Sequence, residues 1–120
     1  MLKILVIEEE ARIRELLRHD LELDGYRVVT TASSHEGLEL VERQSPDLVI
    51  VDELNREMDN METIRKLISH CPRIPVVLTS ASSSPTASPL RRAADAWVPS
   101  SPDTAKLRDQ VRLFLMPDFV

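Results

Sequence analysis

The chain is short of cysteine, glycine and aromatic residues. Among its 120 residues it has one cysteine, two glycines and 3% aromatic residues. A single cysteine, Cys71, excludes a disulfide within the chain and any multi-cysteine metal site, and it is typical of a reducing compartment. We therefore assign Cys71 the role of a small core or edge thiol. No apolar run approaches the roughly 18 residues that a membrane-spanning helix needs, so no membrane association is expected.

Basic residues are also in the minority. The chain has 15 Lys and Arg against 20 Asp and Glu, a formal net charge of −5 at pH 7. Nucleic-acid binding depends on clustered Lys and Arg, so we expect no nucleic-acid partner for this domain. The first residues lack the long apolar segment and cleavage site of a signal peptide, which favours the cytoplasm. The length falls in the usual single-domain range of roughly 100–150 residues, so residues 1–120 are expected to form one domain.

Short apolar runs alternate with segments of helical periodicity along the sequence. Runs typical of buried strands lie at residues 3–7, 26–31, 47–52, 74–79 and 96–98, with 47–52 expected at the centre of the sheet. Apolar residues at helical spacing lie at residues 11–24, 33–43, 61–68 and 104–115. A fourth helix around 90–94 is expected to be short or irregular because Pro85 and Pro89 precede it. The alternation predicts an α/β fold in which helices cover both faces of a parallel sheet.

Acidic and hydroxyl side chains follow three of these strands. Ligands of parallel sheets bind beyond the carboxyl ends of the strands, so function is expected there. The residues at those ends are Glu8, Glu9 and Glu10, then Asp52, then Thr79 and Ser80. Carboxylates held a few Å apart either raise one another's pKa values or bind a cation, and Mg²⁺ fits best because it accepts one or two carboxylates and keeps several waters. The alternative for the three glutamates is a solvated charge run at a helix start.

Five segments of the sequence resemble the receiver domain of two-component response regulators. The segments are residues 3–17, 25–28, 46–52, 58–60 and 74–81. They occur in the order and with the spacing of that family, and the resemblance spans essentially residues 2–116. It implies a flavodoxin-like, doubly wound, five-stranded parallel sheet with strand order 2-1-3-4-5 and helices on both faces. It also implies a signalling protein that is not itself an enzyme.

The resemblance assigns phosphoryl transfer to the acidic residues. Asp52 matches the aspartate that accepts a phosphoryl group from a sensor histidine kinase or a phosphotransfer protein. Glu8 and Glu9 match the acidic pair that binds Mg²⁺ together with the acceptor, and the backbone carbonyl of Leu54 matches the third protein ligand. Such transfer needs little more than a fixed carboxylate and a cation that neutralises developing charge. The alternative for Asp52 is a strand-end carboxylate that caps a loop or pairs with Arg56.

Two further positions match the switch residues of the family. Ser80 matches the hydroxyl that moves towards the phosphoryl oxygens, and Trp97 falls at the aromatic position that changes rotamer with it. The resemblance implies signalling to a downstream effector through the face made by the fourth helix, the fifth strand and the last helix. The resemblance also allows a homodimer formed through the same face. A plain loop role for Ser80 and simple packing for Trp97 are the alternatives, and packing is favoured for Trp97.

The sequence departs from the family pattern at two functional positions. Receivers carry a lysine followed by a proline after the fifth strand, whereas this chain has Ser100 or, with one inserted residue, Ser101. Neither supplies a charge, and a guanidinium such as that of Arg56 would have to fill the place. The second acidic position is Glu9 where the family more often has Asp. The extra methylene is expected to weaken a Mg²⁺ site that demands octahedral geometry.

Two functions therefore stay open. The first is a working receiver in a phosphorelay, in which a phosphoryl group on Asp52 shifts a conformational equilibrium. The second is a pseudo-receiver, a protein interaction module that presents the same face without phosphoryl control. A Mg²⁺-dependent phosphotransferase or hydrolase is disfavoured because the sequence has no Gly-rich phosphate loop and no basic clamp.

Overall fold

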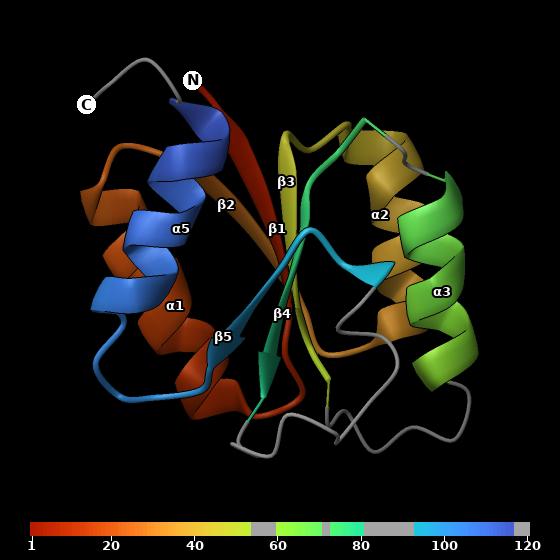
Figure 1. Cartoon of the computed structure of the whole chain (residues 1–120), viewed down its shortest axis with the longest axis horizontal. Helices are drawn as coiled ribbons and strands as arrows, with labels where there is room; N and C mark the ends of the chain where they lie inside the picture. The colour runs from red at the N-terminus through yellow and green to blue at the C-terminus, as the bar shows by residue number, and fades with distance from the viewer. Residues whose placement is uncertain (54–59, 71–72, 81–92, 117–120) are drawn as a thin grey trace.

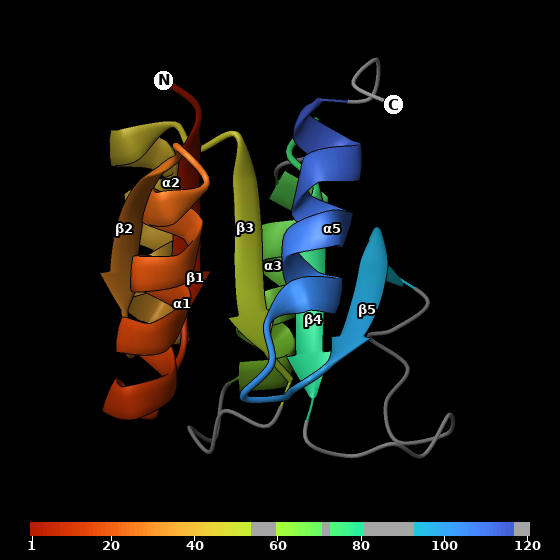
Figure 2. The same ribbon diagram turned by 90° about the vertical axis from the view of Figure 1, so that its left-hand side faces the viewer.

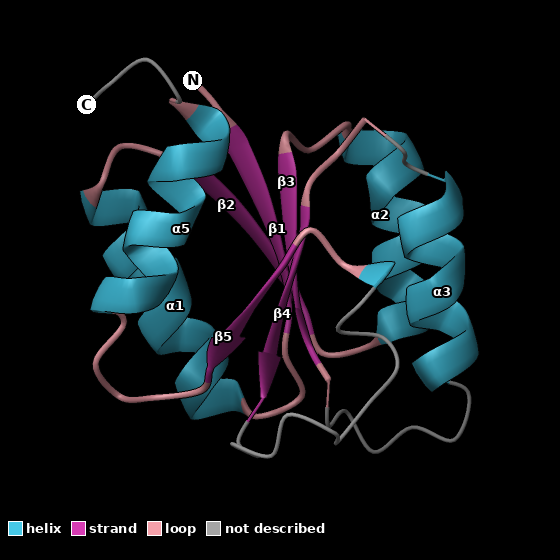
Figure 3. Ribbon diagram, viewed as in Figure 1, coloured by secondary structure: helices cyan, strands magenta, loops and turns pink. Residues whose placement is uncertain are grey.

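Five parallel strands and four helices alternate along the chain in a computed structural model, which describes residues 1–53, 60–70, 73–80 and 93–116. The strands are β1 (Lys3–Ile7), β2 (Arg27–Thr31), β3 (Leu48–Asp52), β4 (Val76–Ser80) and β5 (Ala96–Pro99). The helices are α1 (Ala11–Leu23), α2 (Ser34–Gln44), α3 (Asn60–His70) and α5 (Ala105–Leu115). Figure 3 shows how they alternate. The predicted fourth helix falls largely outside the described residues, as do Cys71, Leu54 and Arg56.

The sheet has the order β2-β1-β3-β4-β5, and every neighbouring pair is parallel. The predicted doubly wound α/β sheet is therefore confirmed, with residues 47–52 contributing its central strand. Helices α1 and α5 cover one face, and α2 and α3 cover the other (Figure 1). The arrowheads of β2, β3, β4 and β5 point the same way, so their carboxyl ends lie along one edge (Figure 2).

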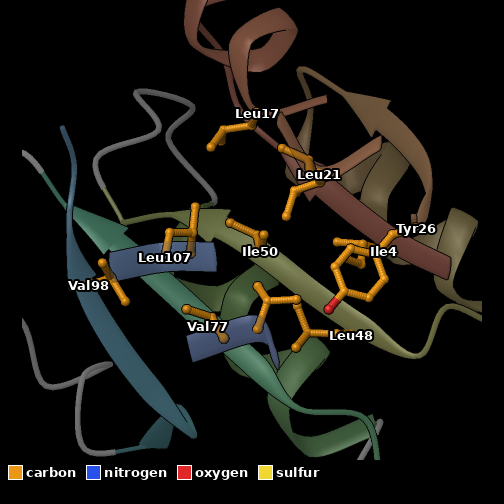
Figure 4. Packing of buried hydrophobic residues seen from close by; sticks show 11 residues of the cluster. Ile4, Leu17, Leu21, Tyr26, Leu48, Ile50, Val77, Val98 and Leu107 are labelled. Atoms are coloured by element: carbon orange, nitrogen blue, oxygen red, sulfur yellow. The ribbon is translucent and has the colours of Figure 1, made fainter. Parts of the chain in front are cut away.

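Alternate residues of each strand enter two separate cores. The core facing α1 and α5 contains Ile4, Val6, Leu17, Leu21, Tyr26, Leu48, Ile50, Val77, Val98, Leu107 and Val111 (Figure 4). The core facing α2 and α3 contains Leu5, Ile7, Val41, Val49, Val51, Leu67, Val76 and Leu78. Because a sheet covered on both faces must bury both sides of its strands, its sequence reads as continuous apolar runs. The alternation also indicates the face on which the residue after each strand lies.

Both glycines of the chain occupy positions that other residues fill only with strain. Gly25 follows the end of α1 and has a φ of +97°, a conformation that L side chains rarely adopt. Gly37 lies in α2 directly against β1, where a Cβ would lie 2.8 Å from Cγ1 of Ile7. The scarcity of glycine thus leaves one residue for a helix end and one for close packing of helix on sheet.

One predicted strand is shifted along the sequence for a local reason, and one predicted helix cap is confirmed. The strand expected at 74–79 runs instead from Val76 to Ser80, because Pro75 has no N–H to donate to the ladder. Ser80 consequently pairs with Pro99 as the last residue of β4. Ser33 or Ser34 was expected to cap the helix that runs to about Arg43, and Ser33 does so, because its side chain accepts a hydrogen bond from the Glu36 N–H.

Polar contacts join α1 to α5, the two helices that cover the same face of the sheet. The Thr104 hydroxyl donates to Asp20 at 2.7 Å. The Arg108 guanidinium donates to both carboxylate oxygens of Asp24, at 2.8 and 2.6 Å. These bonds hold the pKa of each aspartate below its ordinary value, through Thr104 for Asp20 and through Arg108 for Asp24.

Among the described residues, no helix combines the length and the apolar character needed to cross a membrane.

Candidate functional site

Four adjacent strands carry polar residues to the carboxyl edge of the face that α1 and α5 cover. Glu8, Asp52, Thr79 and Ser100 each stand two residues beyond a member of the core on that face. Residues two apart in a strand point to the same side of the sheet. The side chains of these four residues therefore emerge on one side of one edge. This is the edge at which the sequence predicts a site.

The ladder continues beyond the ends of β1 and β5, which keeps this alternation intact. The Glu8 N–H donates to the carbonyl of Thr31 at 2.9 Å. The Ser100 N–H donates to the carbonyl of Ser80 at 2.7 Å. Glu8 and Ser100 are thus held in the same extended arrangement as the strands that precede them.

Glu8 and Asp52 form a hydrogen-bonded carboxyl pair at the centre of this edge. Glu8 is only 3% exposed. Its burial raises the pKa of Glu8 to about 8, and the hydrogen bond and the charge of Asp52 act in the same direction. Two neighbouring carboxyl groups do not both ionise readily. Glu8 therefore keeps its proton, and its carboxyl O–H donates a hydrogen bond to Asp52. A raised pKa is one of the two consequences expected of crowded carboxylates, and binding of a cation is the other.

The two glutamates after Glu8 have different surroundings. Glu9 and Glu10 are exposed. Glu10 is the N-cap residue of α1, and its side chain makes no capping hydrogen bond. The acidic run is therefore divided into a buried carboxyl that faces Asp52 and two carboxylates at the start of a helix. The division follows from the chain leaving the sheet after Glu8 and entering α1 at Ala11.

Arg14 ties the backbone of this acidic segment to α1. Its Nη1 donates to the carbonyl of Glu8 at 2.8 Å and to the carbonyl of Glu9 at 3.2 Å. Arg14 was not predicted as a residue of the site, because apolar periodicity does not indicate which side chains reach backbone carbonyls. The available signal is a basic residue in the second turn of a helix that directly follows three glutamates.

The two residues predicted as switch positions share the opposite face of the sheet. Ser80 is 1% exposed and stands two residues beyond Leu78, a member of the core facing α2 and α3. Trp97 is half-buried, packs against that same core and pairs with Leu78 in the register of β4 and β5. The structure thus brings both positions to neighbouring places on one face. Packing, the reading favoured for Trp97, is a role that the residue has here.

The donor set fits a small hard cation. Glu8 and Asp52 supply two carboxyl groups from neighbouring strands, and Mg²⁺ in proteins is bound through one or two carboxylates with waters completing its shell. A cation between them would allow both groups to ionise. Within the part of the chain that the structure describes, no three acidic, histidine or cysteine side chains gather as a fuller metal cluster. The backbone carbonyl of Leu54, the predicted third ligand, lies outside the described residues.

A cavity of about 220 Å³ lies beside this edge, between α1 and the segment after β5. Leu16 and Leu107 give it apolar walls, and Thr79 and Ser100 border it from the sheet edge. Arg12 is the one basic residue among its described lining residues. The side chain of Ser100 therefore adjoins open space rather than a packed core.

Comparisons with known proteins agree with this geometry. Residues 4–98 match the response regulator receiver domain family. The alkaline phosphatase synthesis transcriptional regulatory protein PhoP of Bacillus subtilis is 33% identical over 79 residues, which are 66% of this chain and 33% of PhoP. The response regulator TrrA of Thermotoga maritima in complex with Mg²⁺-BeF is similar with a TM-score of 0.87 and 29% identity, over 96% of this chain and 100% of that chain.

A second solved structure contains a kinase. It is the complex of the histidine kinase ThkA with TrrA, which is similar with a TM-score of 0.86 and 29% identity, over 96% of this chain and 99% of that chain. The chain spans only about a third to a half of the length of the curated relatives that it matches.

Proposed function

The chain belongs to the response regulator receiver domain family, and from this premise we propose that Asp52 accepts a phosphoryl group from the histidine of a partner kinase or phosphotransfer protein. The observation that carries the proposal is the hydrogen-bonded pair of Asp52 and buried Glu8 at the carboxyl edge of the sheet. The similarity to TrrA, which was solved with Mg²⁺-BeF and with the histidine kinase ThkA, supports it.

The proposed reaction moves one phosphoryl group between two side chains. An Asp52 carboxylate oxygen attacks the phosphorus of the phosphohistidine, the phosphorus–nitrogen bond breaks, and the imidazole leaves with the electron pair. The carboxylates of Glu8, Glu9 and Asp52 and the Leu54 carbonyl would hold Mg²⁺, and the Glu8 proton would pass to water when the cation binds. When bound, Mg²⁺ neutralises charge on the phosphoryl oxygens.

We also propose that Ser80 and Trp97 carry the signal away from the phosphorylation site. Ser80 offers its hydroxyl to the phosphoryl oxygens, and Trp97 responds on the same face of the sheet. Ser80 pairs with Pro99 of β5 and Trp97 lies within β5, which supports an output through β5. We propose that this output, together with α5, reaches a downstream effector or a second copy of the chain. We place this function in the cytoplasm, in a single domain of residues 1–120 that takes no nucleic-acid partner and is not itself an enzyme.

Two features support a weakened site. Ser100 has no charge to pair with a phosphoryl group, although its backbone is fixed next to Ser80. Glu9 has a longer side chain than the aspartate expected at the second acidic position. We therefore propose that Mg²⁺ is bound less tightly than it would be with aspartate at position 9, and that the phosphoryl group is held less firmly than it would be with a basic side chain at position 100.

A phosphorylation-independent interaction module is the second candidate. The lack of a basic side chain after β5, where the chain has Ser100 and Ser101, favours it, because no ammonium is available there to pair with a phosphoryl group. The two candidates differ in what Asp52→Asn does. In a working receiver this substitution abolishes the phosphorylation-dependent change in partner binding, whereas a pseudo-receiver binds its partner equally well with either residue.

The direct test is incubation with Mg²⁺ and acetyl phosphate followed by intact mass spectrometry. Wild type is expected to gain the mass of one phosphoryl group, and Asp52→Asn and a sample with EDTA are expected to gain none. Asp109→Asn, at an exposed residue of α5, is the matched control and should behave as wild type. An unmodified wild type, or an adduct that persists in Asp52→Asn, contradicts the proposal.

A further inference from the structure

The backbone of Glu8 is hydrogen-bonded at both its N–H and its carbonyl. Its N–H donates to the Thr31 carbonyl at the end of β2, at 2.9 Å. Its carbonyl accepts from Arg14 at 2.8 Å, and the same Nη1 of Arg14 reaches the Glu9 carbonyl at 3.2 Å. The backbone between β1 and α1 therefore has one anchor in the sheet and one in the helix. Both anchors act on the residue whose side chain meets Asp52.

Arg14 is also the first residue whose backbone N–H enters the hydrogen bonding of α1. Glu10 is the N-cap residue, and its side chain makes no capping hydrogen bond. The first helical hydrogen bond runs from the Arg14 N–H to the Glu10 carbonyl at 2.9 Å. Arg14 thus closes the first turn with its backbone and holds the two preceding carbonyls with its guanidinium. The directions of these carbonyls determine where the side chains of Glu8 and Glu9 leave the backbone.

Arg14 also places a permanent positive charge next to an acidic site. A guanidinium stays protonated under all ordinary conditions, and its rigid fork of donors loses little entropy when it forms hydrogen bonds. Arg14 is partly buried, which limits the screening of its charge by water. Arg18, one turn further along α1, is different, because it pairs with Glu15 on the exposed surface of the helix. The two arginines therefore form a natural pair of test and control positions.

From this geometry we propose that Arg14 is the positioning residue of the site, which fixes the Glu8 and Glu9 backbone so that their carboxyl groups can act together with Asp52. The inference rests on the proposed Mg²⁺ site for its functional meaning. It concerns backbone atoms and a side chain that the family match does not assign. Removal of a residue that orients metal ligands without contacting the metal typically lowers the metal affinity by 10–100-fold.

The test is a Mg²⁺ titration of wild type, Arg14→Gln, Arg14→Lys and Arg18→Gln. Binding is monitored by NMR through the amide resonances of residues 8–10. Arg14→Gln is expected to weaken Mg²⁺ binding by about tenfold or more. Arg14→Lys, which keeps the charge but offers a single ammonium, should recover part of the loss. Arg18→Gln should bind as wild type does. Equal affinity in wild type and Arg14→Gln overturns the inference, because a merely structural role would lower thermal stability alone.

A second measurement on the metal-free proteins separates this inference from the proposed function. Amide hydrogen exchange at residues 8–10 is expected to be about tenfold faster in Arg14→Gln than in wild type, while Arg18→Gln leaves it unchanged. Unchanged exchange in Arg14→Gln overturns the positioning role. If wild type itself binds no Mg²⁺, the proposed metal site fails, and the exchange result still decides whether Arg14 holds the segment.

Discussion

Glu8 of the first strand and Asp52 of the third share a hydrogen bond between their carboxyl groups. The bond exists because β1 and β3 are neighbours and because both residues follow core residues of the same face. The pair holds a proton while no cation is present, and burial raises the pKa of Glu8 to about 8. In the proposed site, a cation would therefore have to displace this proton.

Glu8→Gln separates these two properties. The amide can still donate a hydrogen bond to Asp52 but carries no charge, so the metal-free protein is expected to be as stable as wild type or more stable. Mg²⁺ binding should weaken by about tenfold or more, because one carboxylate is lost. Thermal unfolding with and without Mg²⁺ measures both effects, and Glu10→Gln at the exposed helix start is the control. Equal stabilisation by Mg²⁺ in Glu8→Gln and wild type would remove Glu8 from the site.

Ser100→Lys should strengthen the site. The backbone of Ser100 is fixed by its hydrogen bond to Ser80, and its side chain borders a cavity of about 220 Å³ that can accept a longer chain. An ammonium close to a phosphoryl mimic is worth about 1.4 kcal/mol, so beryllofluoride should bind about tenfold more tightly. Ser100→Met, similar in length and uncharged, should not reproduce the gain. The same improvement in both variants would show that filling the cavity, not charge, is responsible.

Asp24→Asn should change how stability depends on pH. Arg108 holds the pKa of Asp24 below its ordinary value, so the pair stabilises the fold above the unfolded pKa of about 4 and loses this contribution as pH falls through the folded value. The variant is expected to lose about 1–2 kcal/mol at pH 7 and to approach wild type in acid. Urea unfolding at several pH values measures the difference. Asp109→Asn is the control, since its partner Arg112 is exposed; a gap that stays constant with pH contradicts the account.

Gly37→Ala tests the close packing of α2 on β1. Alanine is the better helix former by about 1 kcal/mol, so helix propensity alone predicts stabilisation. A Cβ at this position would overlap the buried side chain of Ile7, and we expect a net loss of about 1–3 kcal/mol. Chemical denaturation of Gly37→Ala, alone and combined with Ile7→Val, measures the loss and its partial rescue. A stabilised Gly37→Ala would show that the helix and strand yield easily.

Local patterns determine most of the fold and half of the site. Short continuous apolar runs between helical segments predict strands buried on both faces, and parallel strands bring the carboxylates at their ends to one edge, which correctly places Glu8 with Asp52. Glu9, predicted as a Mg²⁺ ligand with Glu8, is exposed where the chain turns into α1, and its role as a ligand stays a prediction. Arg14 was missed because its partners are backbone carbonyls. The link between Thr104 and Asp20 was missed because 84 positions separate them.

The most direct test of the central claim is an amide NMR titration of wild type and Asp52→Asn with beryllofluoride, with and without Mg²⁺. The account predicts Mg²⁺-dependent shifts in wild type at residues 8–10, at Ser80 and along β5, with none in Asp52→Asn. Beryllofluoride mimics the phosphoryl group, so these shifts would report both the acceptor and the response. A wild-type spectrum that does not change when both are added would contradict the claim that Asp52 is a phosphoryl acceptor and would leave the interaction module as the function of this receiver.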